Sequence, residues 1–180
     1  MVTKTYEQER IFVRGMGSKQ YNAAEYRRWL KEHPRVIKGN TIPYEGGPRH
    51  WNRMLVTPES CPCQTIFTHI EFFGPGAAGL KHGHQNEAMF YILEGRGHEI
   101  HDNKRYDWEA GDVVIVHNGC VHQHFNDDPE KPARALIIKS KPVFLLFNLM
   151  QQSHVEAAPD IGREMAPPEL HVFTGEVKGG

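Results

Sequence analysis

The sequence of 180 residues contains few cysteines, no long apolar run and no block of a single charge. The three cysteines are Cys61, Cys63 and Cys120. Because their number is odd and the sequence shows no secretion signal, a disulfide framework is not expected. One residue separates Cys61 from Cys63, which is too few for the usual zinc or redox spacing. No apolar stretch approaches the ~18 residues of a membrane span, and the polar residues 1–10 lack a signal-peptide core. A cytoplasmic protein is therefore expected.

The charges are balanced and dispersed. Lysine and arginine number 21, aspartate and glutamate 22, and the formal net charge is −1. This gives no electrostatic reason to expect nucleic acid or a membrane surface as a partner. A hydrophobic content of 39% with 24% charged residues is typical of a globular protein, and the length suits one domain.

Short strand patterns occupy most of the chain after residue 50. They lie at residues 51–57, 65–73, 80–85, 88–94, 98–101, 105–108, 112–116, 122–125 and 133–139. Turn residues separate them every ten residues or so, which is typical of an antiparallel sandwich or barrel. Residues 142–151 fit either a final strand or a short helix. The predicted fold class is all-β, with the barrel over residues 51–158 and a loop-like tail over residues 159–180.

Residues 1–50 are predicted to form an N-terminal arm with one helix. Asn22 can cap this helix, Glu25 stands three residues later as the second half of a capping box, and Pro34 ends it. The apolar residues that share one face are Tyr26, Trp29 and Leu30. Their i, i+3, i+4 spacing predicts that the helix docks on the barrel.

Two His-x-His pairs are the most informative feature of the sequence: His82 with His84, and His122 with His124. About one such triplet is expected by chance in a chain with 12 histidines, so a single pair says little. Alternate residues of a strand share a face, so the two rings of each pair point the same way. If both faces line the barrel interior, the imidazoles meet in one cavity. There they can bind a divalent first-row metal and leave positions open for substrate.

The segments around these pairs resemble the two motifs of the cupin superfamily. The first motif matches at His82, His84 and Gly95. The second matches at Gly111, Asp112, Gly119, His122 and Asn126, with His117 in place of the usual proline. The resemblance implies a cupin jelly-roll β-barrel, preceded here by the helical arm.

The chain departs from the first cupin motif at its carboxylate. Ala88 occupies the usual glutamate position, and Glu87 lies one residue earlier. A shift of one residue turns a strand side chain to the other face, so Glu87 is expected to point away from the metal unless a bulge re-aims it. The predicted metal ligands are therefore His82, His84 and His122 only.

This ligand set is similar to that of the gentisate and salicylate 1,2-dioxygenase group. The similarity implies Fe(II), O₂ and the cleavage of a chelating, oxygenated substrate. It places His124 at the position of a histidine that assists catalysis, and Glu71 at that of a cavity glutamine. Phe90 stands where that group has an arginine for the substrate carboxylate, and phenylalanine cannot bind one. Asn126 shares a face with His124 and is also predicted to line the pocket.

The predicted function is a mononuclear Fe(II) dioxygenase that cleaves a small hydroxylated aromatic or enolisable substrate with O₂. An all-imidazole site also suits Mn, Ni or Zn. A non-oxidative isomerase, lyase or decarboxylase is therefore an alternative, as is a small-molecule-binding cupin without catalysis. His124 fits either an acid/base role or a purely structural hydrogen bond.

Two further expectations concern the surface. Arg49, Arg53 and Arg96 are candidates to bind an anionic substrate, or else ordinary surface residues. A homodimer is expected through the arm or a sheet edge, because exposed strand edges need covering.

Overall fold

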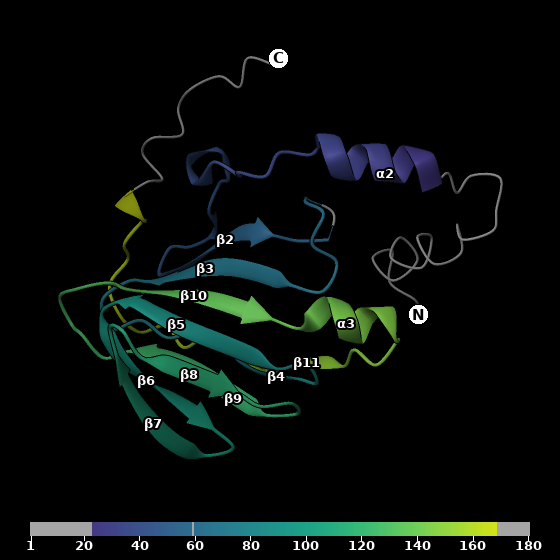
Figure 1. The fold of residues 1–180 in the computed structure, drawn as a ribbon. Helices are drawn as coiled ribbons and strands as arrows, with labels where there is room; N and C mark the ends of the chain where they lie inside the picture. The colour runs from purple at the N-terminus through teal and green to yellow at the C-terminus, as the bar shows by residue number, and fades with distance from the viewer. Residues whose placement is uncertain (1–22, 59, 169–180) are drawn as a thin grey trace.

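The computed structural model describes residues 23–58 and 60–168. Two antiparallel sheets face each other (Figure 1). The first has the order β1 (Glu45–Gly46), β2 (His50–Val56), β3 (Phe67–Phe73), β10 (Ala133–Lys139), β5 (Ala88–Glu94) and β8 (Val113–Val116). The second has the order β11 (Gln152–Glu156), β4 (Lys81–His84), β9 (Val121–Asn126), β6 (Arg96–His101) and β7 (Lys104–Glu109). The predicted all-β jelly-roll is confirmed.

All nine predicted strands are present, each within two residues of its expected ends. Their inward faces follow the period of two: in β5, for example, Ala88, Phe90 and Ile92 are buried while Tyr91 and Leu93 are exposed. Residues 142–151 were predicted to form either a strand or a short helix. The short helix α3 (Lys141–Leu146) covers the first part of this range. The strand β11 was not predicted. It pairs with β4, the strand that carries the first histidine pair.

The predicted N-terminal helix is present as α2 (Ala23–Glu32), followed by a 3₁₀ turn, η1 (Gly39–Thr41). Its expected cap, Asn22, lies outside the described residues. The expected docking is not observed: α2 lies away from both sheets (Figure 1), and Trp29 is 37% exposed. The exposed residues of the helix include Arg27, Arg28 and Lys31. No helix within the described ranges is long and apolar enough to span a membrane.

Residues 159–168 lie along the first sheet. The Trp51 indole donates a hydrogen bond to the carbonyl of Met165 at 3.0 Å, and the Arg163 amide donates to the carbonyl of Pro75 at 2.7 Å. Pro167 is buried. This part of the tail therefore covers the outer face of β2 and the loop after β3.

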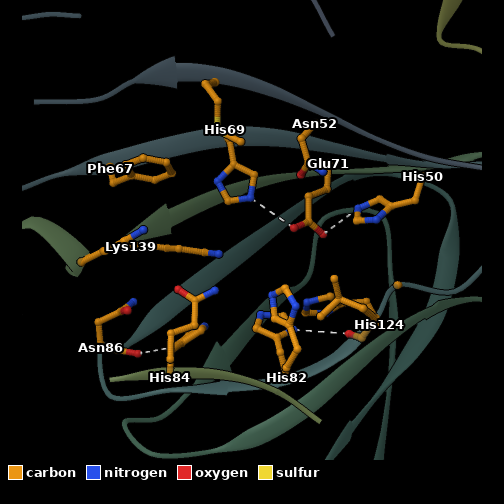
Figure 2. Close-up of a pocket in the computed structure, with 16 residues that line it drawn as sticks. His50, Asn52, Phe67, His69, Glu71, His82, His84, Asn86, His124 and Lys139 are labelled. Carbon is orange, nitrogen blue, oxygen red and sulfur yellow. Dashed lines mark hydrogen bonds and ion pairs between the residues drawn. The ribbon is translucent and has the colours of Figure 1, made fainter. Parts of the chain in front are cut away.

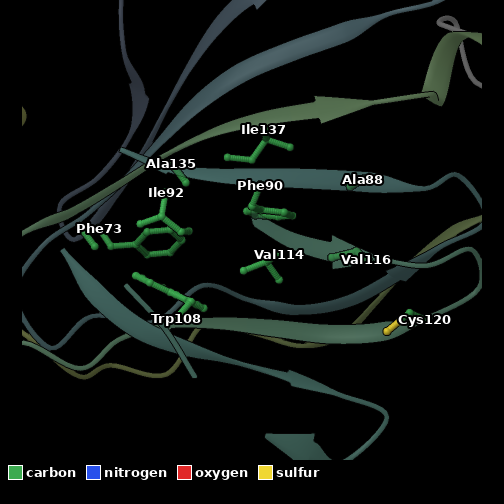
Figure 3. Close-up of a cluster of buried hydrophobic side chains, with 11 residues drawn as sticks. Phe73, Ala88, Phe90, Ile92, Trp108, Val114, Val116, Cys120, Ala135 and Ile137 are labelled. Carbon is green, nitrogen blue, oxygen red and sulfur yellow. The ribbon is translucent and has the colours of Figure 1, made fainter. Parts of the chain in front are cut away.

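The space between the sheets is divided between a polar cavity (Figure 2) and an apolar core (Figure 3). The core comprises Phe73, Ala88, Phe90, Ile92, Trp108, Val114, Val116, Cys120, Ala133, Ala135 and Ile137. These side chains come chiefly from β5, β8 and β10, with Trp108 contributed by β7 of the opposite sheet. Burial of this apolar surface fixes the two sheets against each other and gives the cavity a rigid wall.

Candidate metal centre and its cavity

Strand register brings the two histidine pairs together. His82 of β4 lies directly opposite His122 of β9, and their ring centroids are 4.3 Å apart. The rings of His84 and His122 are 4.8 Å apart. The nitrogen atoms that these three residues can offer a metal all lie within 4.8 Å of one another. Three imidazoles, each at most 9% exposed, therefore converge on one point inside the barrel.

The backbone fixes how these rings can bind. The Nδ1 atoms of His82, His84 and His122 face the carbonyl oxygens of Leu80 (3.3 Å), Asn86 (2.7 Å) and Cys120 (3.2 Å). A carbonyl only accepts, so each Nδ1 carries the hydrogen and each Nε2 keeps its lone pair. The Nε2 atoms of His84 and His122 are buried and have no hydrogen-bond partner in the described part of the chain. This donor set fits a divalent cation.

Burial also keeps the three rings neutral. It lowers the pKa of His82 to about 3 and that of His84 to about 4, and the positive charge of His124 adds to both effects. Burial lowers the pKa of His122 further still. All three are therefore uncharged at neutral pH, which is the form that binds metal.

The stability of the metal-free protein is expected to fall as the pH drops below 6.5. Unfolded histidines take up protons near pH 6.5, whereas folded His82 and His84 resist protonation down to about pH 3 and 4. Their contribution is complete above pH 6.5 and lost progressively below it, by about 2 kcal/mol for each at pH 5. The raised pKa of His124 acts in the opposite sense but is a single group. Urea denaturation from pH 7.5 to 4.5 measures the trend, and an unchanged midpoint would contradict it.

His124 lies beside the three rings and has an acidic partner. Glu99 of β6 is opposite His124 of β9 in the strand register, and the His124 Nδ1–H donates to its carboxylate. Burial disfavours charge on His124, but the negative charges of Glu99 and Glu71 outweigh it and raise the pKa of His124. His101 Nε2 lies 3.7 Å from the same Glu99 oxygen. His124 therefore holds a proton next to the metal ligands.

A cavity of about 220 Å³ opens above these residues (Figure 2). On the opposite wall the Nε2–H of His69 donates to Glu71 at 3.1 Å, and His50 Nε2 lies 3.6 Å from the second Glu71 oxygen. Burial raises the pKa of Glu71, yet the charge of His124 and the contacts with both histidines hold it well below its usual value. Glu71 is thus a buried anion facing a cluster of imidazoles.

Residues 69–139 match the family described as cupin domain.

These residues form a cupin domain.

Relatives of this cupin domain are distant and longer. The 5-aminosalicylate 1,2-dioxygenase of Comamonas sp is 23% identical over 117 residues, which are 65% of this chain and 30% of that protein. The salicylate 1,2-dioxygenase of Pseudoaminobacter salicylatoxidans superposes with a TM-score of 0.55 at 16% identity, over 74% of this chain and 36% of that one. An RmlC-like cupin from Shewanella frigidimarina superposes with a TM-score of 0.51 at 20% identity, over 59% of this chain and 90% of that one. The chain thus spans about a third of the length of the two dioxygenases.

Not all of the predicted pocket residues reach the cavity of the cupin domain. Glu71 and His124 line it, together with His82 and His84. Phe90 and Asn126 do not. Phe90 belongs to the apolar core, with its ring centroid 4.6 Å from that of His124.

Asn126 is diverted by backbone hydrogen bonds. Its amide group donates to the carbonyls of Gly74 and Lys131, both at 2.9 Å, so it anchors two loops. Because Asn126 shares a strand face with His124, its side chain does point into the barrel. It lies, however, at the end of the barrel that these two loops close.

Glu87 points out of the cupin domain, as the one-residue shift predicts. It is exposed, and its carboxylate accepts a hydrogen bond from the Ser140 hydroxyl at 2.7 Å. Ala88 takes the inward position and is buried. Among the described residues, no aspartate or glutamate belongs to the cluster formed by His82, His84 and His122.

Several cavity residues were missed by sequence reasoning. Lys139, Lys141, Asn86, His50, Asn52, Gln152 and His154 all line the cavity. The period of two could have revealed Lys139, because it continues the inward series of β10 after Ala135 and Ile137. Gln152 and His154 could not be found this way, since β11 has no distinct pattern of its own and is exposed throughout.

A second group of possible metal ligands comprises Asp102, His117 and Cys120. Asp102 and His117 are exposed, and one Asp102 oxygen already accepts the Val121 amide at 3.1 Å. Cys120 is fully buried, and burial raises its pKa to about 11. Its thiol is therefore a packed core group.

Proposed function

We propose that this cupin domain binds Fe(II) through His82, His84 and His122 and cleaves a small hydroxylated aromatic or enolisable molecule with O₂. The observation that carries the proposal is the convergence of three buried, neutral imidazoles that no carboxylate joins within the described ranges. Three neutral ligands leave the full charge of the cation to attract an anionic, chelating substrate. Three protein ligands also leave coordination positions open for it.

The metal would supply Lewis acidity and, as Fe(II), a redox-active centre at which O₂ can react, while the four electrons that reduce O₂ come from the substrate that takes up both oxygen atoms. The remaining tasks belong to side chains of this chain. His124 holds a proton at the edge of the cavity and can give it to a developing oxyanion. One Glu71 oxygen is buried and its contact with His50 Nε2, at 3.6 Å, is longer than a hydrogen bond, so it can accept a hydrogen bond from a substrate hydroxyl. The core behind Phe90 excludes water from one side.

The two longer relatives, although low in sequence identity, support this chemistry. The names of both longer relatives describe 1,2-dioxygenases acting on salicylates. A cavity of about 220 Å³ is below the ~300–1,000 Å³ typical of sites for drug-sized ligands, so it suits a substrate with a single ring.

We also propose that the chain forms a homodimer through the edge of its first sheet. The strand β8 pairs only with β5 among the described strands, and its outward residues Val113 and Ile115 are 51% and 60% exposed. Tyr91 and Leu93 of β5 extend the same apolar surface. Light scattering on the purified protein measures the mass directly.

Oxygen uptake tests the proposed reaction. The protein is loaded with Fe(II) under anaerobic conditions and then offered catechols, hydroquinones, hydroxybenzoates and β-diketones at an oxygen electrode. We expect one O₂ to be consumed per substrate molecule with at least one of these classes, and no uptake by protein loaded with Zn²⁺ as a control. Turnover in the absence of O₂ would instead identify an isomerase, lyase or decarboxylase. Failure to retain any metal would indicate a binding protein without catalysis.

A further inference from the structure

Lys139 brings a positive charge into the cavity. It ends the inward series of β10 that runs through Ala133, Ala135 and Ile137, so its side chain enters the cavity instead of the solvent. Figure 2 shows it reaching into the space between His69 and His84.

The ammonium group of Lys139 has no counter-ion at contact distance. Within the described residues, no carboxylate lies within 4.0 Å of it and no hydrogen bond holds it, although Glu71 is near enough to act on it electrostatically. Its positive charge acts to lower the pKa of the histidines that surround the cavity, namely His69, His82, His84 and His124. Burial lowers the pKa of Lys139, because a charged ammonium is costly away from water when no counter-ion is in contact with it. An anion bound in the cavity would supply the missing counter-ion.

The arginines that were candidates for this task are held elsewhere. None of them lines the cavity. Their partners are Asp160 at 2.6 Å for Arg49, the Tyr44 ring at 4.0 Å for Arg53, and Asp128 at 3.3 Å for Arg96. The other cations of the cavity wall are also engaged, because His124 is paired with Glu99 and the Lys141 ammonium lies 5.7 Å from the centre of the Phe67 ring. Lys139 is therefore the cation best placed to meet a substrate.

The cavity also contains a complementary acceptor. Glu71 Oε2 is buried, with its residue only 5% exposed, and His50 Nε2 lies 3.6 Å from it, an ion-pair distance that is too long for a hydrogen bond. An unsatisfied carboxylate oxygen favours a ligand N–H or O–H and repels an anion. A bound molecule would consequently turn its acidic group toward Lys139 and its hydroxyl or amine toward Glu71.

We infer that Lys139 determines substrate specificity by binding a carboxylate, in a cavity that selects small carboxylic acids with a hydroxyl or amino group. This inference rests on the proposed function. It places the carboxylate anchor on β10 and not at position 90, where the side chain is buried in the apolar core. A lysine ammonium is a compact point charge on a flexible stem, which suits a carboxylate that must also approach a metal.

Anaerobic titration calorimetry on the Zn²⁺-loaded protein tests the inference without turnover. The probes are salicylate and its neutral amide, salicylamide. Wild-type protein is expected to bind salicylate more tightly than salicylamide. In Lys139→Met, a charge-assisted hydrogen bond is lost, so the affinity for salicylate should fall by about 10- to 100-fold. Salicylamide should bind as in wild type, which also shows that the variant is folded.

Two further variants sharpen the test. Lys139→Arg retains the charge and should retain the preference for the acid. Lys104→Met makes the same substitution on the exposed β6–β7 hairpin and should change neither affinity. Equal binding of acid and amide by wild type, no binding of either, or unchanged salicylate binding by Lys139→Met would overturn the inference. Lys139-dependent binding without O₂ uptake by the Fe(II) protein would leave it standing and refute the dioxygenase proposal alone.

Discussion

Replacement of His84 by alanine is expected to abolish metal binding and, with it, oxygen uptake. The variant loses one of three imidazoles whose Nε2 atoms converge, and His84 Nε2 is one of the two that are buried without a partner. Loss of groups that merely orient a metal ligand already costs about 10- to 100-fold in affinity, so removal of a ligand should cost more. Metal content by mass spectrometry after dialysis, together with the oxygen electrode, measures both effects.

Two controls accompany this substitution. Glu87→Ala should keep its metal, because Glu87 is exposed and bonded to Ser140 outside the barrel. His117→Ala removes an exposed histidine of the second ligand group and should also keep it. Metal loss in Glu87→Ala would refute the three-histidine assignment. Metal loss in His117→Ala would move the site to the group around Asp102 and Cys120.

Replacement of His124 by asparagine is expected to lower kcat by about 10²- to 10⁴-fold, the usual contribution of a general acid or base, while the metal content stays unchanged. Asparagine can still donate a hydrogen bond to Glu99, so the buried contact is preserved while the transferable proton is lost. Steady-state kinetics with the substrate found by oxygen uptake measures the effect. An unaltered kcat would contradict an acid role for His124.

The partner of His124 separates an acid role from a structural one. In Glu99→Gln the hydrogen bond can persist, but the negative charge that raises the pKa of His124 is gone. His124 then loses its proton at lower pH, so the alkaline limb of the kcat profile should move toward acid. Glu94→Gln, on the exposed end of β5, is the matched control and should leave the profile in place. Reduced stability without a shift of the profile would indicate that the pair is only structural.

The strands could be predicted because alternation and turn residues are local properties. Nine strands follow from the period of two and from the glycine, proline, asparagine and aspartate between them. The helix α2 was found for the same reason, from the positions of its caps and its ending at Pro34. Its packing was not predictable, because an apolar stripe shows which face can dock but not whether a partner surface is within reach.

The candidate site was likewise predictable only in part. His82 and His84 share a face by spacing alone, and the position of Glu87 beside Ala88 sends its carboxylate outward. Phe90 and Asn126 also face inward, but Phe90 packs in the apolar core and Asn126 is hydrogen-bonded to loop carbonyls. Strand alternation tells which side of a sheet a residue occupies, but not how far along the barrel it lies.

By itself the sequence determined the strands and their inward faces, since each depends on spacing within a few residues, and the resemblance to the cupin motifs indicated which imidazoles would bind a metal. Only the tertiary structure decided that β4 and β9 lie side by side, that Glu99 holds His124, and that Lys139 shares a cavity with Glu71. These pairings join residues far apart in the chain. Their register is set by the packing of whole sheets, a cooperative property that no local pattern contains.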